Sequence, residues 1–112
     1  MNNFPPEVMK RFRDEYISTV PEKLKTMERL LDEMHDSVRE KTLQDLRLLV
    51  NKIAGSAGTY GFAAVSDVCK EFETEILSKI ALHRGAVGDP RWAVGFREYL
   101  VRIKKGFLDV KS

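Results

Sequence analysis

Two histidines and one cysteine are the side chains of this sequence best suited to nucleophilic or metal-binding chemistry. They are His35, Cys69 and His83, and they lie far apart in the chain. A neutral imidazole has a ring nitrogen with a free lone pair, which can bind a metal or attack phosphorus. A zinc site needs several ligands in a recognisable spacing, which these three residues lack. The sequence therefore predicts no metal site and no cofactor.

Each of the three residues also has a simple structural interpretation. His83 precedes Arg84 near the end of a predicted helix, where a cation is favourable. Cys69 falls on an apolar stripe and is expected to be a small buried residue. His35, followed by Asp36, is expected to lie on the surface near a helix end.

Enzymatic chemistry finds little support elsewhere in the sequence. The carboxylates occupy mostly solvated helical positions, and no pair of them has the apolar surroundings of an acid/base dyad. The glycine-rich segment 55–58 follows a predicted helix, whereas phosphate-binding loops precede one. We therefore expect a protein that is not an enzyme and has no small-molecule substrate.

Composition narrows the class of protein further. The chain has 112 residues, which suits a single domain over 1–112, and 43% of them are hydrophobic. The net charge of +2 comes from 19 basic and 17 acidic residues that are well mixed, so neither nucleic acid nor a membrane is an expected partner. A single cysteine, short apolar runs and no apolar signal-peptide core favour a cytoplasmic location.

Hydrophobic spacing predicts helices throughout and no convincing strand. The first half predicts a short N-terminal helix and then a second one. A possible capping box at Thr19 and Glu22, with Pro21 in the first turn, marks the start of the second helix. The apolar positions recur every three or four residues in both: Val8, Phe12, Tyr16 and Val20, then Leu24, Met27, Leu31, Met34 and Val38.

Three further helices follow. The first should begin near Ser37 or Thr42 and end at Gly61, a good left-handed C-terminal residue. The next should end near His83, Arg84 and Gly85, and the last should start with Asp89 as N-cap and Pro90 at the first position. Their expected inward stripes are Leu43, Leu46, Val50, Ile53 and Ala57; Val65, Val68, Cys69, Phe72, Ile76 and Ile80; and Trp92, Phe96, Leu100, Ile103 and Phe107. The predicted fold is all-α, an antiparallel four-helix bundle with a short extra N-terminal helix.

The helix before Gly61 has a second face that should look at solvent. With the apolar stripe turned inward, Arg47, Asn51, Ala54, Gly55 and Gly58 share this other face, since residues three and four apart are neighbours. The exposed Leu48 and the basic Lys52 border it. Small residues let another backbone come close, so this face can receive a partner.

The stretch from Leu46 to Glu73 resembles the histidine-containing phosphotransfer (HPt) domain family. That family has a helix with His, then Leu two residues on, Lys at three, and Gly-Ser at four and five. Here Ile53, Gly55, Ser56 and Gly61 stand at the expected spacings, and Val65, Cys69, Phe72 and Glu73 follow in step. The phosphoacceptor position is Asn51 and the Lys position is Ala54.

The resemblance implies a role in two-component phosphorelay signalling. In the family this face binds a response-regulator receiver domain or a histidine kinase. An amide nitrogen is not a nucleophile, because its lone pair is delocalised, so Asn51 implies a docking, scaffold or inhibitory domain without phosphotransfer. The expected partner-binding residues are Arg47, Leu48, Asn51, Lys52, Ala54, Gly55, Gly58 and Phe62.

Two alternatives remain open at this point. His35-Asp36 is similar to the His-Asp box of one class of sensor kinases, although Glu40 and Thr42 break the later positions of that box. His35 could therefore be a phosphoacceptor. The chain could also be a plain helical interaction or oligomerisation module that uses its glycine-rich helix end as a contact surface.

Overall fold

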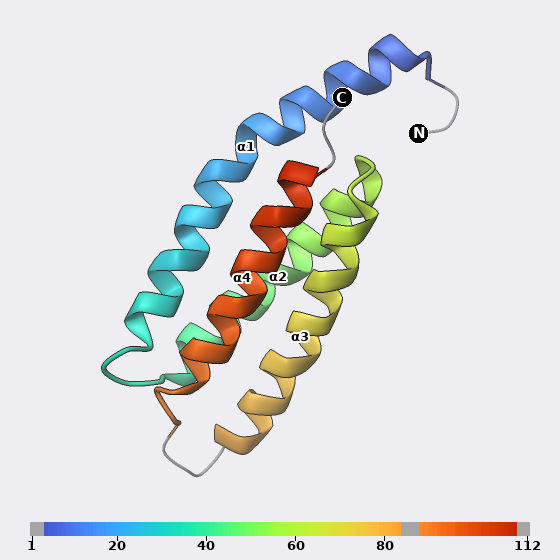
Figure 1. The fold of residues 1–112 in the computed structure, drawn as a ribbon. Coiled ribbons are helices and arrows are strands. Elements are labelled where there is room, and N and C mark those ends of the chain that lie inside the picture. The colour runs from blue at the N-terminus through green and yellow to red at the C-terminus, as the bar shows by residue number, and fades with distance from the viewer. Residues whose placement is uncertain (1–3, 84–87, 110–112) are drawn as a thin grey trace.

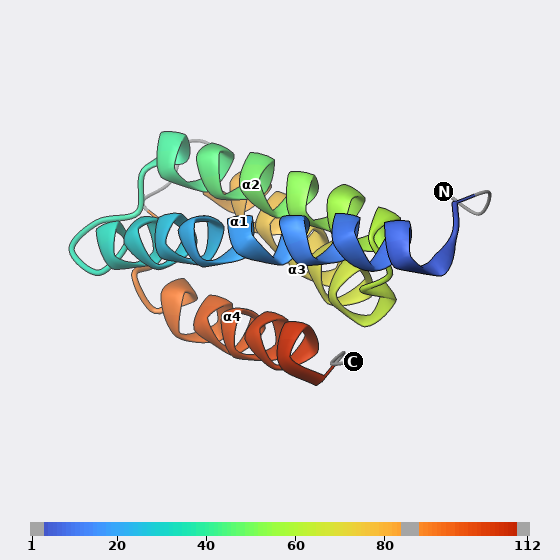
Figure 2. The same cartoon turned by 90° about the horizontal axis from the view of Figure 1, so that it is seen from above.

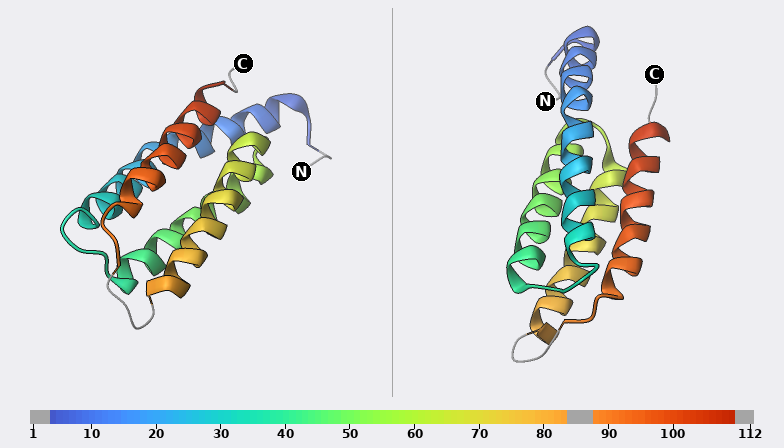
Figure 3. Two further views of the ribbon diagram at one scale, coloured as in Figure 1. Left: turned by 60° about the horizontal axis from the view of Figure 1, so that its bottom comes forward. Right: turned by 90° about the vertical axis from the view of Figure 1, so that its left-hand side faces the viewer.

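The computed structural model describes residues 4–83 and 88–109. Within these ranges the chain forms four helices: α1 (Pro6–Glu33), α2 (Glu40–Thr59), α3 (Ala63–His83) and α4 (Trp92–Asp109). They run alternately up and down, so the predicted all-α antiparallel four-helix bundle is confirmed (Figure 1). Each helix packs against its two neighbours in the order α1, α2, α3, α4 and back to α1, and α2 lies diagonally opposite α4 (Figures 2 and 3).

The predicted break between a short N-terminal helix and the next one is wrong. α1 is one continuous helix of 28 residues with Pro21 inside it. Thr19 does not cap a helix start, because its hydroxyl donates to the backbone oxygen of Tyr16. Proline leaves the carbonyl of Ile17 without its helical donor. Ile17 and Pro21 are both exposed, so water can donate to that carbonyl and the helix continues.

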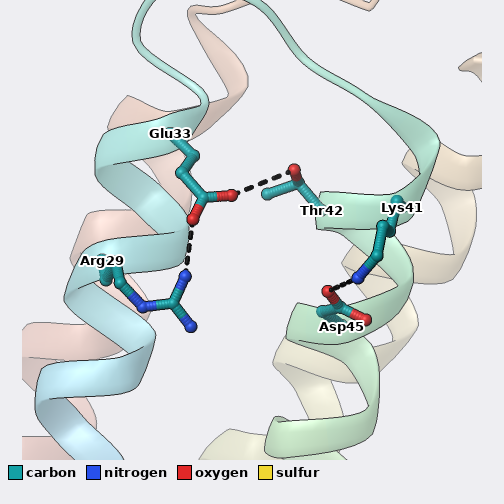
Figure 4. Close-up of polar contacts among 5 residues, drawn as sticks. All are labelled: Arg29, Glu33, Lys41, Thr42 and Asp45. Carbon is teal, nitrogen blue, oxygen red and sulfur yellow. Dashed lines mark hydrogen bonds and ion pairs between the residues drawn. The ribbon is translucent and has the colours of Figure 1, made fainter.

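The first turns of α1 extend beyond the ends of the other helices (Figure 1). The other end of α1 is tied to the start of α2 (Figure 4). There the Glu33 carboxylate accepts from Arg29 at 2.6 Å and from the Thr42 hydroxyl at 3.4 Å. Neither predicted side-chain cap of α2 forms: Arg39 stands at the N-cap position without a capping hydrogen bond.

The core follows the predicted stripes closely. All five inward positions of α2 are buried, and Phe72 and Phe96 join α3 to α4 with their ring centroids 5.3 Å apart. The predicted inward positions that are only partly buried are Val8, Phe12, Leu24, Val68 and Trp92. Burial of aliphatic and aromatic side chains from all four helices is the main term that stabilises such a bundle.

The turn between α2 and α3 has the geometry that Gly61 predicts. Gly61 has φ of +91°, the left-handed region. The N–H of Phe62 donates to the oxygen of Ala57 at 2.8 Å, and that of Gly61 donates to Gly58 at 3.4 Å. These two bonds are a Schellman motif, which ends α2 sharply and sends α3 back along it.

The role of His83 and the start of α4 differ from expectation. His83 does not cap its own helix: its Nε2 lies 3.0 Å from the carbonyl oxygen of Val38, in the α1–α2 connection. α3 itself ends at His83, within the predicted His83–Gly85 stretch, and Gly85 lies outside the described residues. α4 begins at Trp92, two residues later than expected, after a turn in which the Asp89 carboxylate accepts from the N–H and guanidinium of Arg91.

Replacing Gly61 by alanine should destabilise the bundle, because a side chain at this positive φ costs about 1–2 kcal/mol. Urea unfolding followed by circular dichroism measures the change. The matched control is Gly95→Ala, at a helical site with open space around the added methyl. That substitution should stabilise by about 0.5–1 kcal/mol. Equal effects of the two substitutions would contradict the turn argument.

Cys69 should be inert in the native protein. It is fully buried, and burial raises the pKa of its thiol to about 12, so very little thiolate exists at pH 8. A chromogenic disulfide reagent at pH 8 should label the native protein only at the rate of unfolding, and in urea it should label one thiol at once. Rapid labelling without denaturant would show that the thiol is accessible.

Candidate functional site

The outward face of α2 carries most of the residues that the sequence singles out. Leu48 is 52% exposed, and Asn51, Lys52, Gly55 and Gly58 are exposed as well, while Arg47 is partly buried. The inward stripe of α2 occupies the opposite side of the helix. The expected solvent-facing surface therefore exists, centred on Asn51.

Glu73 of α3 is the residue that organises the polar part of this surface. The Asn51 side-chain amide nitrogen lies 3.2 Å from each carboxylate oxygen of Glu73. The Arg47 Nε lies 3.9 Å from the same carboxylate. Only 17% of the Glu73 side chain is exposed, so its charge is held at the interface between α2 and α3, where the Asn51 amide donates to it and the Arg47 cation pairs with it.

Sequence reasoning places Glu73 in the family motif but does not assign it to the site. The register of the α2–α3 hairpin would have predicted that Glu73 lies beside Asn51. Asn51 and Glu73 are eleven residues before and after Phe62, where the antiparallel hairpin turns. The same register places Gly58 opposite Ser66, whose hydroxyl oxygen would lie 3.3 Å from a Cβ added to that glycine.

Two of the residues predicted to bind a partner are buried. Ala54 is only 6% exposed, because α3 packs against it and the Ser66 hydroxyl donates to its backbone oxygen at 2.8 Å. Phe62 is fully buried and packs against Tyr16 and Phe107, with ring centroids 6.0 and 5.2 Å away. Both residues stabilise the hairpin and cannot contact a partner.

The two glycines of the surface differ in their surroundings. A Cβ added at Gly55 meets no atom within 4 Å, so this position is open toward solvent. At Gly58 the added atom meets Ser66, so the absence of a side chain there lets α3 approach closely. Small residues on this helix therefore serve both the internal packing of the hairpin and the open surface.

Ser56 joins this segment to α1. Its hydroxyl lies 2.8 Å from the Tyr16 hydroxyl and donates to the backbone oxygen of Lys52 at 2.9 Å. The Tyr16 ring stacks on Tyr60, with centroids 4.8 Å apart. Burial raises the pKa of Tyr16, and the phenol stays neutral as the bridge between α1 and the Gly-Ser segment.

Apolar surface continues from α2 onto α3. Leu77 is 45% exposed and lies one turn beyond Glu73 on the same side of α3. Lys70 is exposed one turn before Glu73. The surface thus combines Leu48 and Leu77 with the cations of Arg47, Lys52 and Lys70.

Neither histidine lies on this surface. His35 is exposed in the turn after α1. Asn51 stands eleven residues into α2, about 16 Å along the helix from its start. His83 contacts the α1–α2 connection instead.

Over residues 4–83 and 88–109, no group of three or more His, Cys, Asp and Glu side chains is close enough to hold a metal ion. None of the helices in these ranges is long and apolar enough to cross a membrane.

Comparison with protein families gives one match. The family model described as "Hpt domain" covers residues 11–105, which spans all four helices except the first turns of α1 and the last of α4. No curated protein and no solved structure matches the chain. The chain therefore belongs to the Hpt domain family of phosphorelay signalling, whose members carry phosphoryl groups rather than act as enzymes and interact with receiver domains and histidine kinases.

Proposed function

We propose that this Hpt domain docks a receiver domain or a histidine kinase through the surface around Asn51 without accepting a phosphoryl group there. The observation that carries the proposal is the residue at the acceptor position: an amide that donates to Glu73, where the family has an imidazole. It would then scaffold, sequester or inhibit its partner.

The chemistry at position 51 supports this reading. Imidazole offers a ring nitrogen lone pair for attack on phosphorus, whereas the amide lone pair of Asn51 is delocalised into its carbonyl. The Asn51 NH₂ group is also already engaged as a donor to Glu73.

The surrounding surface is suited to binding. Leu48 and Leu77 supply exposed apolar area, and Gly55 lets another backbone approach without a side chain in the way. Arg47, Lys52 and Lys70 give the rim a positive charge that complements an acidic partner such as the acceptor Asp site of a receiver.

Asn51→His should convert the domain into a working phosphoacceptor. An imidazole at this position can donate one N–H to Glu73, which leaves the other nitrogen free as a nucleophile. Incubation with a panel of phosphorylated receivers should move label onto the variant, while the natural chain and an Asn51→Gln control stay unlabelled.

Label on the natural chain would overturn the proposal, and His35→Ala would then show whether His35 is the acceptor. If Asn51→His stays unlabelled with every receiver that binds, the surface is not a phosphotransfer site. If no receiver or kinase binds at all, the chain is a helical module of another kind.

Leu48→Asp should weaken binding to the partner about tenfold or more, because it places an unpaired charge in the apolar part of the docking surface. Calorimetric titration with a receiver that binds the natural chain measures the loss. The control is Leu82→Asp: Leu82 is 59% exposed but lies on the opposite side of α3 from Glu73. Equal losses from both variants would place the binding site elsewhere.

A further inference from the structure

The outer face of α4 carries three strongly exposed apolar side chains in a line. Val94, Val101 and Leu108 are 67%, 64% and 62% exposed, the three highest values among the large exposed hydrophobic residues. They are seven residues apart, and positions seven apart drift by only about 20° around a helix. The three side chains therefore form one apolar stripe along the length of α4.

Charged side chains flank this stripe on the side toward α3. Glu98 and Lys105 are both exposed. Glu98 is three residues before Val101 and Lys105 is four residues after it. From the helical rotation, both lie about 40–60° to the same side of the stripe.

The apolar stripe and its flanking charges on one α4 helix match those on a second α4 helix that runs antiparallel to it. When two α4 helices are paired antiparallel about Val101, Val94 of one copy faces Leu108 of the other. Glu98 of one copy and Lys105 of the other then lie on the same edge of the stripe. Their heights along the helix axis differ by about 1.5 Å, the rise of one residue. Two-fold symmetry repeats the pair, so each dimer gains two Glu–Lys contacts. A parallel pairing about a two-fold axis would put the Glu98 and Lys105 side chains of the two copies on opposite edges of the stripe, so these contacts would be lost.

The side of the stripe toward α1 does not bring unpaired like charges together in such a pairing. It carries the cations Arg97 and Lys104, but each is neutralised within its own chain. Arg97 donates to Asp32 of α1, and Lys104 donates to Glu28, both at 2.6 Å. This edge therefore presents ion pairs rather than a row of like charges.

Apolar surface also extends from the end of the stripe onto α1. Leu108 lines a shallow apolar groove together with Ile17, Val20, Pro21, Leu24 and Phe107. In the antiparallel pairing, Val94 of the second copy is brought to this end of the helix. The groove adds apolar area to what the stripe alone would bury.

We propose that a second copy of this chain covers the outer face of α4, so that the domain forms a symmetric antiparallel dimer centred on Val101. This surface is separate from the one around Asn51. Because α4 lies diagonally opposite α2 in the bundle, the dimer leaves both Asn51 surfaces open to partners (Figure 3). The inference does not depend on whether those surfaces bind a receiver.

Charge exchange between two variants tests the pairing directly. Sedimentation equilibrium from about 10 μM to about 1 mM covers the range of weak association. The natural chain should dimerise, and Glu98→Lys and Lys105→Glu should each raise the dissociation constant about tenfold or more, because each replaces two attractive contacts with two repulsive ones. A 1:1 mixture of the two variants should form a heterodimer as tight as the natural dimer, within about threefold, since every facing pair is again Glu with Lys.

Val101→Asp tests the apolar part of the same interface and should abolish dimerisation, while Leu82→Asp, on α3, should leave it unchanged. Circular dichroism shows that each variant is folded. A natural chain that stays monomeric over the whole range would overturn the proposal. A mixture that remains as weakly associated as its two components would overturn it as well, because the antiparallel register would then be wrong.

Discussion

The close antiparallel packing of α2 against α3 is the constraint on which the rest of this structure depends. It begins at Gly61, whose positive φ allows a Schellman motif to end α2 and reverse the chain at once. Gly58 then leaves room for Ser66, and the Ser66 hydroxyl binds the backbone of Ala54. A short turn between long helices leaves little freedom of register, so each residue of α2 meets one defined level of α3.

The polar centre of the surface is a product of that register. Asn51 and Glu73 are brought together because each lies eleven residues from Phe62, at which the hairpin reverses. A carboxylate with so little exposure needs partners: it accepts from the Asn51 amide, and the Arg47 guanidinium forms an ion pair with it at 3.9 Å. The fold of this Hpt domain thus brings the Asn51 amide of α2 and the Glu73 carboxylate of α3 together on one surface.

The surface around Asn51 and the outer face of α4 both carry exposed apolar side chains, but the charges beside those side chains are arranged differently. On α2 and α3, the exposed Leu48 and Leu77 flank a polar centre formed by Asn51, Glu73 and Arg47. On α4 the stripe around Val101 is bordered by Glu98 and Lys105, which would face Lys105 and Glu98 of a second, antiparallel α4. The diagonal placement of α2 and α4 keeps the two faces apart, so occupation of one does not cover the other.

The sequence by itself determined the helices, their inward stripes and the left-handed turn at Gly61, because apolar periodicity and glycine act locally. It did not determine what lies across each helix. Ala54 and Phe62 are buried and Glu73 reaches Asn51 only because α3 has one rotation and register against α2, which the periodicity of either helix alone does not fix. The same holds for α1, which continues through Pro21. Proline breaks a helix unless, as here, the freed carbonyl faces water and the buried side keeps its packing.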